Sequence, residues 1–317
     1  MSANPMIRDG SGLETAVEST LATLNGVILG KPEACRLALA TVLAGGHLLV
    51  EDVPGVGKTT LAKAIALTLG LEFQRIQFTS DMLPADIIGV SIYRRDTETF
   101  EFHRGPIFTE LLLADEVNRA TPKAQSALLE AMQESQVTVD GKALALPRPF
   151  VVIATQNPNE QTGTFPLPES QLDRFLMCIE LGYPDPAHER ELLAGHDTAQ
   201  RLGEIEPALS PQTLTALRAK VDAVRLSEPI LDYLQALVHF TRESPNFQYG
   251  LSPRGALALR QSARALALIE GRHAVYPDDV QRVLPAIVRH RLVPGNAAGQ
   301  SGNFDPGRHV LDAVAIP

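Results

Sequence analysis

The chain has 317 residues, of which 44% are hydrophobic, and a net charge of −9 at pH 7. That length suits about two domains with a sizeable core. The acidic balance argues against a protein whose main task is to coat nucleic acid. The two cysteines, Cys35 and Cys178, lie far apart in apolar runs and predict buried free thiols in a reducing compartment. Residues 1–12 lack the features of a signal peptide, and no apolar run has the length of a membrane span. We therefore expect a cytoplasmic protein.

Strand and helix patterns alternate over residues 1–183. Helices are predicted at about 13–26, 33–44, 80–89, 122–134 and 168–173, and strands at 48–50, 73–78, 111–116, 150–154 and 175–181. Two hairpins are expected as well, one over 90–102 around a polar turn and one over 136–146 with Asp140-Gly141 at its turn. These elements predict an α/β domain.

A second domain is predicted after Gly182-Tyr183-Pro184-Asp185-Pro186, because strand patterns vanish there. Three later helices each open with a capping serine and a proline in the first turn, at Ser210-Pro211, Ser227-Glu228-Pro229 and Ser252-Pro253. Residues 184–294 are therefore expected to form an all-helical domain. The tail, residues 295–317, contains several glycines and is expected to be disordered.

The stretch that organises the chain is Leu48-Leu49-Val50-Glu51-Asp52-Val53-Pro54-Gly55-Val56-Gly57-Lys58-Thr59-Thr60. A strand, a tight glycine loop, Gly-Lys-Thr and a helix in this order form the phosphate-binding loop of nucleotide triphosphatases. Gly55 and Gly57 let backbone N–H groups approach a polyphosphate, and the helix N-terminus adds its dipole. Lys58 is placed for the β- and γ-phosphates and the Thr59 hydroxyl for Mg²⁺. Asp52 departs from the usual pattern, which opens with glycine. The alternative to a phosphate-binding loop is a chance turn between a strand and a helix.

A second nucleotide-site motif, Asp115-Glu116, follows four apolar residues of a buried strand. Asp115, at the carboxyl edge of that strand, can hold Mg²⁺ through water. Glu116 beside it suits polarisation of the attacking water, so the pair predicts hydrolysis as well as binding. Asn157, after the neighbouring strand, can orient the same water. The alternatives are surface acids at a strand end and an ordinary turn asparagine.

These positions resemble the AAA+ ATPases over nearly the whole chain. The phosphate loop, residues 52–59, is similar to their Walker A motif, and residues 111–116 to Walker B. Asn157 matches the sensor-1 position, Arg254 sensor 2, and Arg174 the arginine finger. Within AAA+, the stretches most similar to the MoxR family are 51–55, 114–120, 154–158 and 167–175. In that family Asp52 is an ordinary residue at its position.

The resemblance implies an αβα core with a parallel five-stranded sheet of order 5-1-4-3-2 and an all-α lid. It assigns the hairpin at 90–104 to a helix-2 insert and residues 135–149 to a pre-sensor-1 hairpin. It also implies ATP and Mg²⁺ as cofactors, with Val27 and Ile28 near adenine; ordinary core packing is the alternative for these two. Arg254 is expected to reach the γ-phosphate of its own subunit when the lid closes.

Arg174 is expected to serve the neighbouring subunit instead. It follows a predicted helix and precedes a strand, which places it at a domain surface. A guanidinium aimed outward there suits the charge that develops on a γ-phosphate across an interface. An intrachain salt bridge with Asp173 or Glu169 is the alternative.

The family resemblance further implies ring oligomers, usually hexamers, that remodel or mature protein complexes, often with a von Willebrand factor A-domain partner. Two other functions stay open: a metal-chelatase subunit and a nucleic-acid motor. A motor would need basic pore hairpins, but the first hairpin sets three arginines against three acids. We therefore expect protein clients and no nucleic-acid partner.

Overall fold

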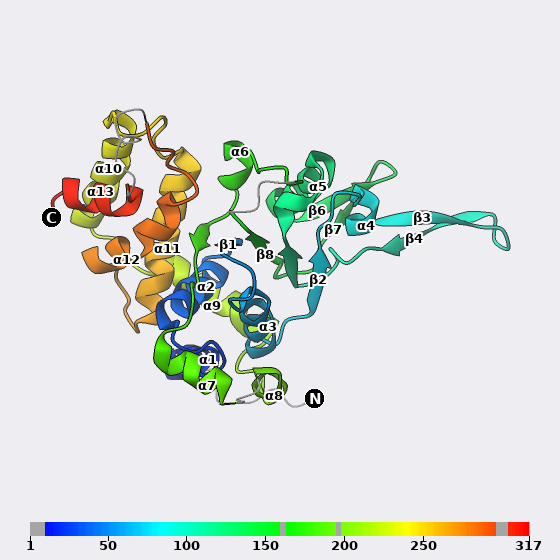
Figure 1. Ribbon diagram of the computed structural model, residues 1–317, viewed down its shortest axis with the longest axis horizontal. Coiled ribbons are helices and arrows are strands. Elements are labelled where there is room, and N and C mark those ends of the chain that lie inside the picture. Colours follow the sequence, from blue (N-terminus) through cyan, green and yellow to red (C-terminus); the bar gives the residue numbers. More distant parts are fainter. Residues whose placement is uncertain (1–9, 159–162, 195–197, 296–303, 317) are drawn as a thin grey trace.

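A five-stranded parallel sheet forms the centre of the molecule in the computed structural model, which describes residues 10–158, 163–194, 198–295 and 304–316 (Figure 1). In spatial order the strands are β2 (Phe73–Gln77), β5 (Leu111–Asp115), β8 (Val151–Gln156), β1 (Leu48–Glu51) and β9 (Met177–Ile179). Every neighbouring pair is parallel. Numbered along the chain and read from the β9 edge, this is the order 5-1-4-3-2, so the expected topology is confirmed.

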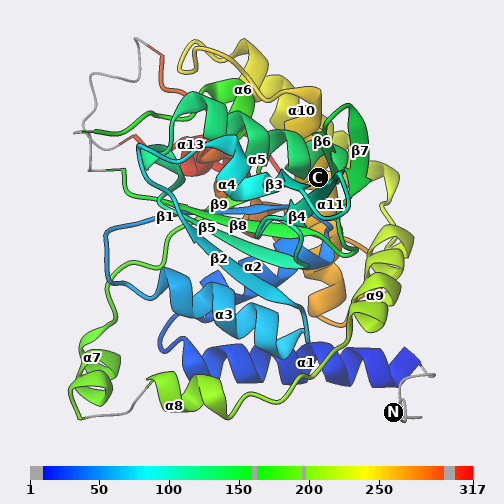
Figure 2. The same cartoon turned by 90° about the vertical axis from the view of Figure 1, so that its right-hand side faces the viewer.

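Helices cover both faces of the sheet (Figure 2). On one face lie α1 (Gly10–Val27), α2 (Pro32–Leu43) and α3 (Lys58–Thr68), and on the other α4 (Pro84–Ile88) and α5 (Pro122–Glu134). Successive strand residues point to opposite faces. Leu111 and Leu113 therefore pack into the core on the α3 side, whereas Leu112 and Ala114 pack against the α5 side. Both faces are buried, which explains the continuous apolar strands.

Two antiparallel hairpins extend from the α5 side, as the sequence predicts. They are β3 (Gly89–Arg94) with β4 (Thr99–Arg104), and β6 (Gln136–Val139) with β7 (Lys142–Ala145). Asp140 and Gly141 both have positive φ, 49° and 76°, as a two-residue hairpin turn requires. The β3–β4 hairpin projects far from the core (Figure 1), and Ser91 Oγ donates to Asp140 Oδ2 at 2.5 Å to link the two hairpins.

Beyond β9, the described residues form helices and no further strand. These helices are α7 (Pro186–Leu193), α8 (Thr198–Gly203), α9 (Pro211–Ala223), α10 (Glu228–Glu243), α11 (Pro253–Ile269), α12 (Pro277–Val288) and α13 (Pro306–Ala313). Ser210 and Ser252 cap α9 and α11 through their hydroxyls, as predicted. Ser227 begins α10 without such a bond. Division of the chain at residues 183 and 294 remains our proposal.

The expectation of a disordered tail is wrong for residues 304–316. Helix α13 packs against α10 and α12, and Val310 is fully buried. The His309 ring lies 5.2 to 5.8 Å from three phenylalanine rings, and the Asp305 carboxylate caps the helix at Arg308 N. The glycines of the tail suggested disorder, but the apolar residues that follow them recur at helical spacing and form α13. Residues 296–303 lie outside the described part of the chain.

Candidate functional site

The candidate site lies where β2, β5 and β8 end beside the start of α3. Period-two alternation places Arg75, Asp115 and Thr155 on the α3 face of these strands. Thr155 Oγ1 donates to Asp115 Oδ1 at 2.6 Å. Arg75 Nη2 donates to Asp115 Oδ2 at 2.7 Å, and Thr59 Oγ1 lies 3.5 Å from that oxygen. The Asp115 carboxylate is therefore held on both oxygens.

The phosphate-binding loop adopts a conformation that only its glycines tolerate easily. Gly55 and Gly57 have φ of 86° and 96°, and a Cβ there would meet no neighbouring atom. The glycines are thus needed for the left-handed backbone. Lys58 follows at the first position of α3, and its Nζ donates to the backbone carbonyls of Asp52 (2.5 Å) and Gln156 (3.4 Å). The ammonium lies across the loop.

The charge of Lys58 is set by opposing effects. Burial lowers its pKa from the ordinary value, while the nearby carboxylates of Asp52 and Asp115 favour the charged form. Glu116 opposes the decrease as well. A bound polyphosphate would add further negative charge here, so we expect nucleotide to favour the ammonium form.

Asp52, the departure from the usual loop pattern, has a specific structural task. Its carboxylate is buried and accepts the N–H groups of Leu181 (2.7 Å) and Gly182 (2.6 Å). It also accepts its own neighbour, Val53 N, at 2.8 Å. A glycine could make none of these bonds. Asp52 therefore ties the phosphate loop to the segment through which the chain leaves β9.

Glu116 and Asn157 occupy the same carboxyl edge of the sheet. Glu116 has a positive φ of 56°, an uncommon conformation for a non-glycine residue. Its N–H donates to Thr155 Oγ1 at 2.9 Å, and its carboxylate pairs with Arg119 at 3.1 Å. Asn157 follows β8, and its carbonyl accepts from Asn118 Nδ2 at 3.3 Å. The two residues are thus brought together at neighbouring strand ends.

The donor set beside the loop fits Mg²⁺. Thr59 supplies a hydroxyl and Asp115 a carboxylate, and both are hard oxygen ligands within 3.5 Å of each other. Mg²⁺ usually binds through one or two such groups, with waters and substrate phosphates completing its shell. Within the described ranges no cluster of three or more metal-ligating residues exists, and this arrangement requires none.

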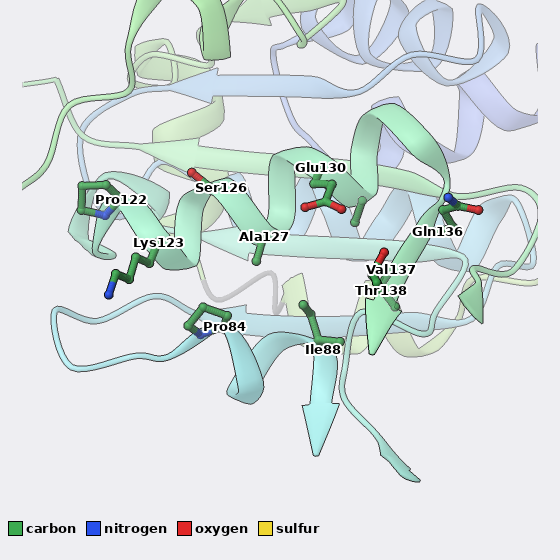
Figure 3. A pocket seen from close by; sticks show the side chains of 11 residues that line it. Pro84, Ile88, Pro122, Lys123, Ser126, Ala127, Glu130, Gln136, Val137 and Thr138 are labelled. Carbon is green, nitrogen blue, oxygen red and sulfur yellow. The ribbon is translucent and has the colours of Figure 1, made fainter. Parts of the chain in front are cut away.

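A pocket of about 260 Å³ adjoins the phosphate loop. Its lining combines the loop with two other segments: Val27, Ile28, Leu29, Lys31, Gly55, Val56, Gly57, Thr60, Gly182 and Pro184. Val27 and Ile28 are buried in the core and also line this pocket. Core packing and a position near adenine are therefore compatible for these two residues. A different pocket of about 510 Å³, between α4, α5 and β6, contains none of the candidate residues (Figure 3).

Arg174 and Arg254 lie together at the opposite edge of the sheet. Both line a pocket of about 450 Å³ with His47, the residue before β1. Arg174 precedes β9, and Leu176 N donates to His47 O at 2.8 Å. The phosphate loop instead follows the carboxyl end of β1. From His47 to Asp52, at the two ends of β1, the chain advances five residues, or about 16 Å at the extended rise.

In the structure Arg254 does not lie at the phosphate loop of its own subunit, where it is expected when the lid closes. Arg254 Nη1 lies 4.0 Å from Asp173 Oδ2, beside Arg174 and away from Lys58. Among the described residues, Arg174 forms no ion pair with Asp173 or Glu169, since Asp173 pairs with Arg291 at 2.8 Å. Arg174 Nη1 donates to the Leu129 carbonyl at 2.6 Å. The salt-bridge alternative for Arg174 is therefore not observed.

Sequence reasoning missed three contributors to the site: Arg75, Thr155 and the Asp52 carboxylate. The strand alternation could have found Thr155, because it has the same parity as the buried residues facing α3. The partners of Asp52 lie about 130 residues away in the chain, and no local pattern announces them.

The chain is similar to known proteins over most of its length. The model of the ATPase family associated with various cellular activities (AAA) matches residues 47–177, and that of the AAA lid domain matches 239–308. Chaperone MoxR1 of Mycobacterium tuberculosis is 41% identical over 322 residues, covering 95% of this chain and 82% of that protein. The magnesium-chelatase 38 kDa subunit of Acidiphilium rubrum is 28% identical and covers 89% and 81%. A crystal structure from Cytophaga hutchinsonii, described as a candidate ATPase, is 36% identical with a TM-score of 0.86, covering 96% of each chain.

Among the described residues, no helix is both long and apolar enough to cross a membrane.

Proposed function

Because the chain belongs to the MoxR family of AAA+ ATPases, we propose that it acts as a ring, hexameric as the resemblance implies, in which ATP hydrolysis drives remodelling or maturation of protein complexes. The observation that supports a ring is the separation of Lys58 from Arg174 and Arg254 at opposite edges of one sheet. This placement favours contact of these arginines with a phosphate bound by another subunit. Neighbouring subunits can bring them together.

Within one subunit, the loop N–H groups and Lys58 bind the phosphates. Thr59 and Asp115 would hold Mg²⁺, and the bound ion would supply positive charge to the phosphate oxygens. Glu116 accepts a proton from the attacking water, and Asn157 orients that water. The order of these groups along the strand ends supports the assignment, since Thr155 bonds both Asp115 and the Glu116 backbone.

The neighbouring subunit completes the site in this proposal. Arg174 places a guanidinium against the γ-phosphate, where negative charge develops during transfer. Arg254 reaches the same phosphate from the same neighbour, because it shares a pocket with Arg174. Its side chain is half exposed, so it is free to turn toward a partner surface.

The β3–β4 hairpin favours polypeptide clients over nucleic acid. Phe100 is 72% exposed, and its ring packs against Tyr93. Arg94 is neutralised by Glu101 at 2.6 Å, which leaves little excess charge for phosphates. A von Willebrand factor A-domain protein is one client class that the resemblance implies. We further propose a cytoplasmic location, which the buried free thiols Cys35 and Cys178 support.

The experiment places a photo-crosslinking amino acid at position 100 in a Glu116→Gln protein. With ATP and Mg²⁺, this variant should sediment as a ring and crosslink to a protein partner. A Lys58→Ala counterpart should not crosslink to that partner, because it cannot hold nucleotide. Crosslinks to nucleic acid alone would establish the motor instead.

A metal-chelatase role is the second candidate, supported by the 28% identity to the magnesium-chelatase subunit. The identity to Chaperone MoxR1 is higher, 41%, over a larger share of the chain. A crosslinked partner that binds a porphyrin would favour the chelatase.

A further inference from the structure

A row of side chains connects lid helix α12 to the phosphate-binding loop. Arg289 follows the last residue of α12, and its Nε lies 3.5 Å from Glu51 Oε2. The other oxygen of Glu51 accepts a hydrogen bond from Gln156 Nε2. Arg289 also pairs with Glu180, just after β9. One lid arginine is thus joined to the ends of β1, β8 and β9.

Gln156 is the residue of this row that contacts the candidate site directly. It is the last residue of β8, and its carbonyl accepts both Asp52 N (3.2 Å) and Lys58 Nζ (3.4 Å). Asn157 follows it directly. Gln156 therefore links a side chain held by Glu51 to a carbonyl that holds the lysine and to the residue next in the chain.

We propose that Arg289 is a positioning residue for ATP hydrolysis, through which the lid sets the end of β8 by way of Glu51 and Gln156. The inference rests on the role proposed for Asn157. The Glu51 side chain is only 17% exposed, so its carboxylate depends on the arginine for a counter-charge. When the lid turns, Arg289 moves with α12 and Glu51 loses or regains that partner. The lid thereby controls how firmly Gln156 is held.

The chain offers a matched control on the same helix. Arg282, seven residues earlier, also joins the lid to the core: it pairs with Glu33 of α2 and with Glu270, the residue after α11, each at 2.9 Å. Its side chain is 30% exposed and that of Arg289 41%. Its ion pairs involve neither Glu51 nor Gln156. Loss of Arg282 should weaken the lid–core contact without touching the site.

The test compares Arg289→Ala, Arg289→Lys and Arg282→Ala by turnover, fluorescent ADP affinity and thermal unfolding. Arg289→Ala should lower kcat by about three- to tenfold, typical of one coupled, partly exposed ion pair. ADP affinity should stay within about twofold, because the loop N–H groups remain. Arg289→Lys should recover part of kcat, and Arg282→Ala should keep wild-type kcat despite a similar loss of thermal stability.

A double-mutant cycle adds a readout specific to the contact. Glu51→Gln should lower kcat in the wild-type background and change it little once Arg289 is alanine. Additive effects of the two substitutions would contradict the proposed coupling of Arg289 to β8 through Glu51. So would equal kcat for Arg289→Ala and Arg282→Ala, or an unchanged kcat in Arg289→Lys and Arg289→Ala alike. If the wild-type protein itself lacked turnover, the proposed function would fail, and the coupling with it.

Discussion

Replacement of Arg174 by alanine tests whether the active site is shared between subunits. In the structure Arg174 lies before β9, beside His47, whereas Lys58 follows the loop at the other end of β1. From His47 to Asp52 the backbone advances about 16 Å, whereas a guanidinium must come within about 3 Å of a phosphate oxygen to bond it. We therefore predict that Arg174 acts on a nucleotide that a neighbouring subunit holds.

The size of the effect follows from the role of an arginine finger. Its loss costs about a thousandfold in rate, or about 4 kcal/mol of transition-state stabilisation. Lys58→Ala subunits should be similarly inactive for lack of nucleotide. In rings mixed randomly at equal amounts, about one site in four joins an intact Lys58 to a neighbour's intact Arg174. Activity should thus return to about a quarter of the wild-type value if the sites act independently.

The assay measures phosphate release per total subunit before and after mixing the two inactive variants, with sedimentation to verify that mixed rings form. A control mixes Lys58→Ala with a Lys58→Ala/Arg174→Ala double variant. This mixture contains no intact lysine and should stay inactive. If Lys58→Ala and Arg174→Ala form mixed rings that remain as inactive as either alone, the shared-site reasoning is refuted and Arg174 acts within its own chain.

Arg254→Ala should also regain activity on mixing with Lys58→Ala; rings that stay dead would return Arg254 to a role in its own subunit. Glu116→Gln should bind ATP with Mg²⁺ but turn over at least about a hundredfold more slowly, and near-normal phosphate release would remove it as the base. DNA at moderate salt should leave turnover unchanged, whereas a stimulation that fades with added salt would revive the motor. Burial lowers the pKa of His47 from 6.5 to about 4, so the stability that neutral His47 contributes is present above pH 6.5 and lost as pH falls toward 4. Between pH 8 and 5.5 the loss is about 1.4 kcal/mol, and urea unfolding of His47→Gln should lack that part of the pH dependence; an equal slope would contradict it.

The sequence by itself determined the local chemistry of the site. Gly55, Gly57 and Lys58 predict a phosphate-binding loop, because their spacing between a strand and a helix is typical of that loop. Asp115 and Glu116 could be placed because a buried parallel strand ends at the sheet's carboxyl edge. Apolar runs and capping residues likewise predicted the elements, since both act within a few residues.

Only the tertiary structure decided how distant segments meet. Arg254 was expected at its own subunit's γ-phosphate, but packing of α11 places it beside Asp173 at the opposite edge of the sheet. The sequence pattern also did not predict the hydrogen bonds of Asp52 with the N–H groups of residues 181 and 182. Nor did it predict the contact of Arg289 with Glu51. Residues this far apart in the chain become neighbours through the shape of the whole core. That shape depends on all the buried contacts together, so a local pattern of residues could not reveal these pairings.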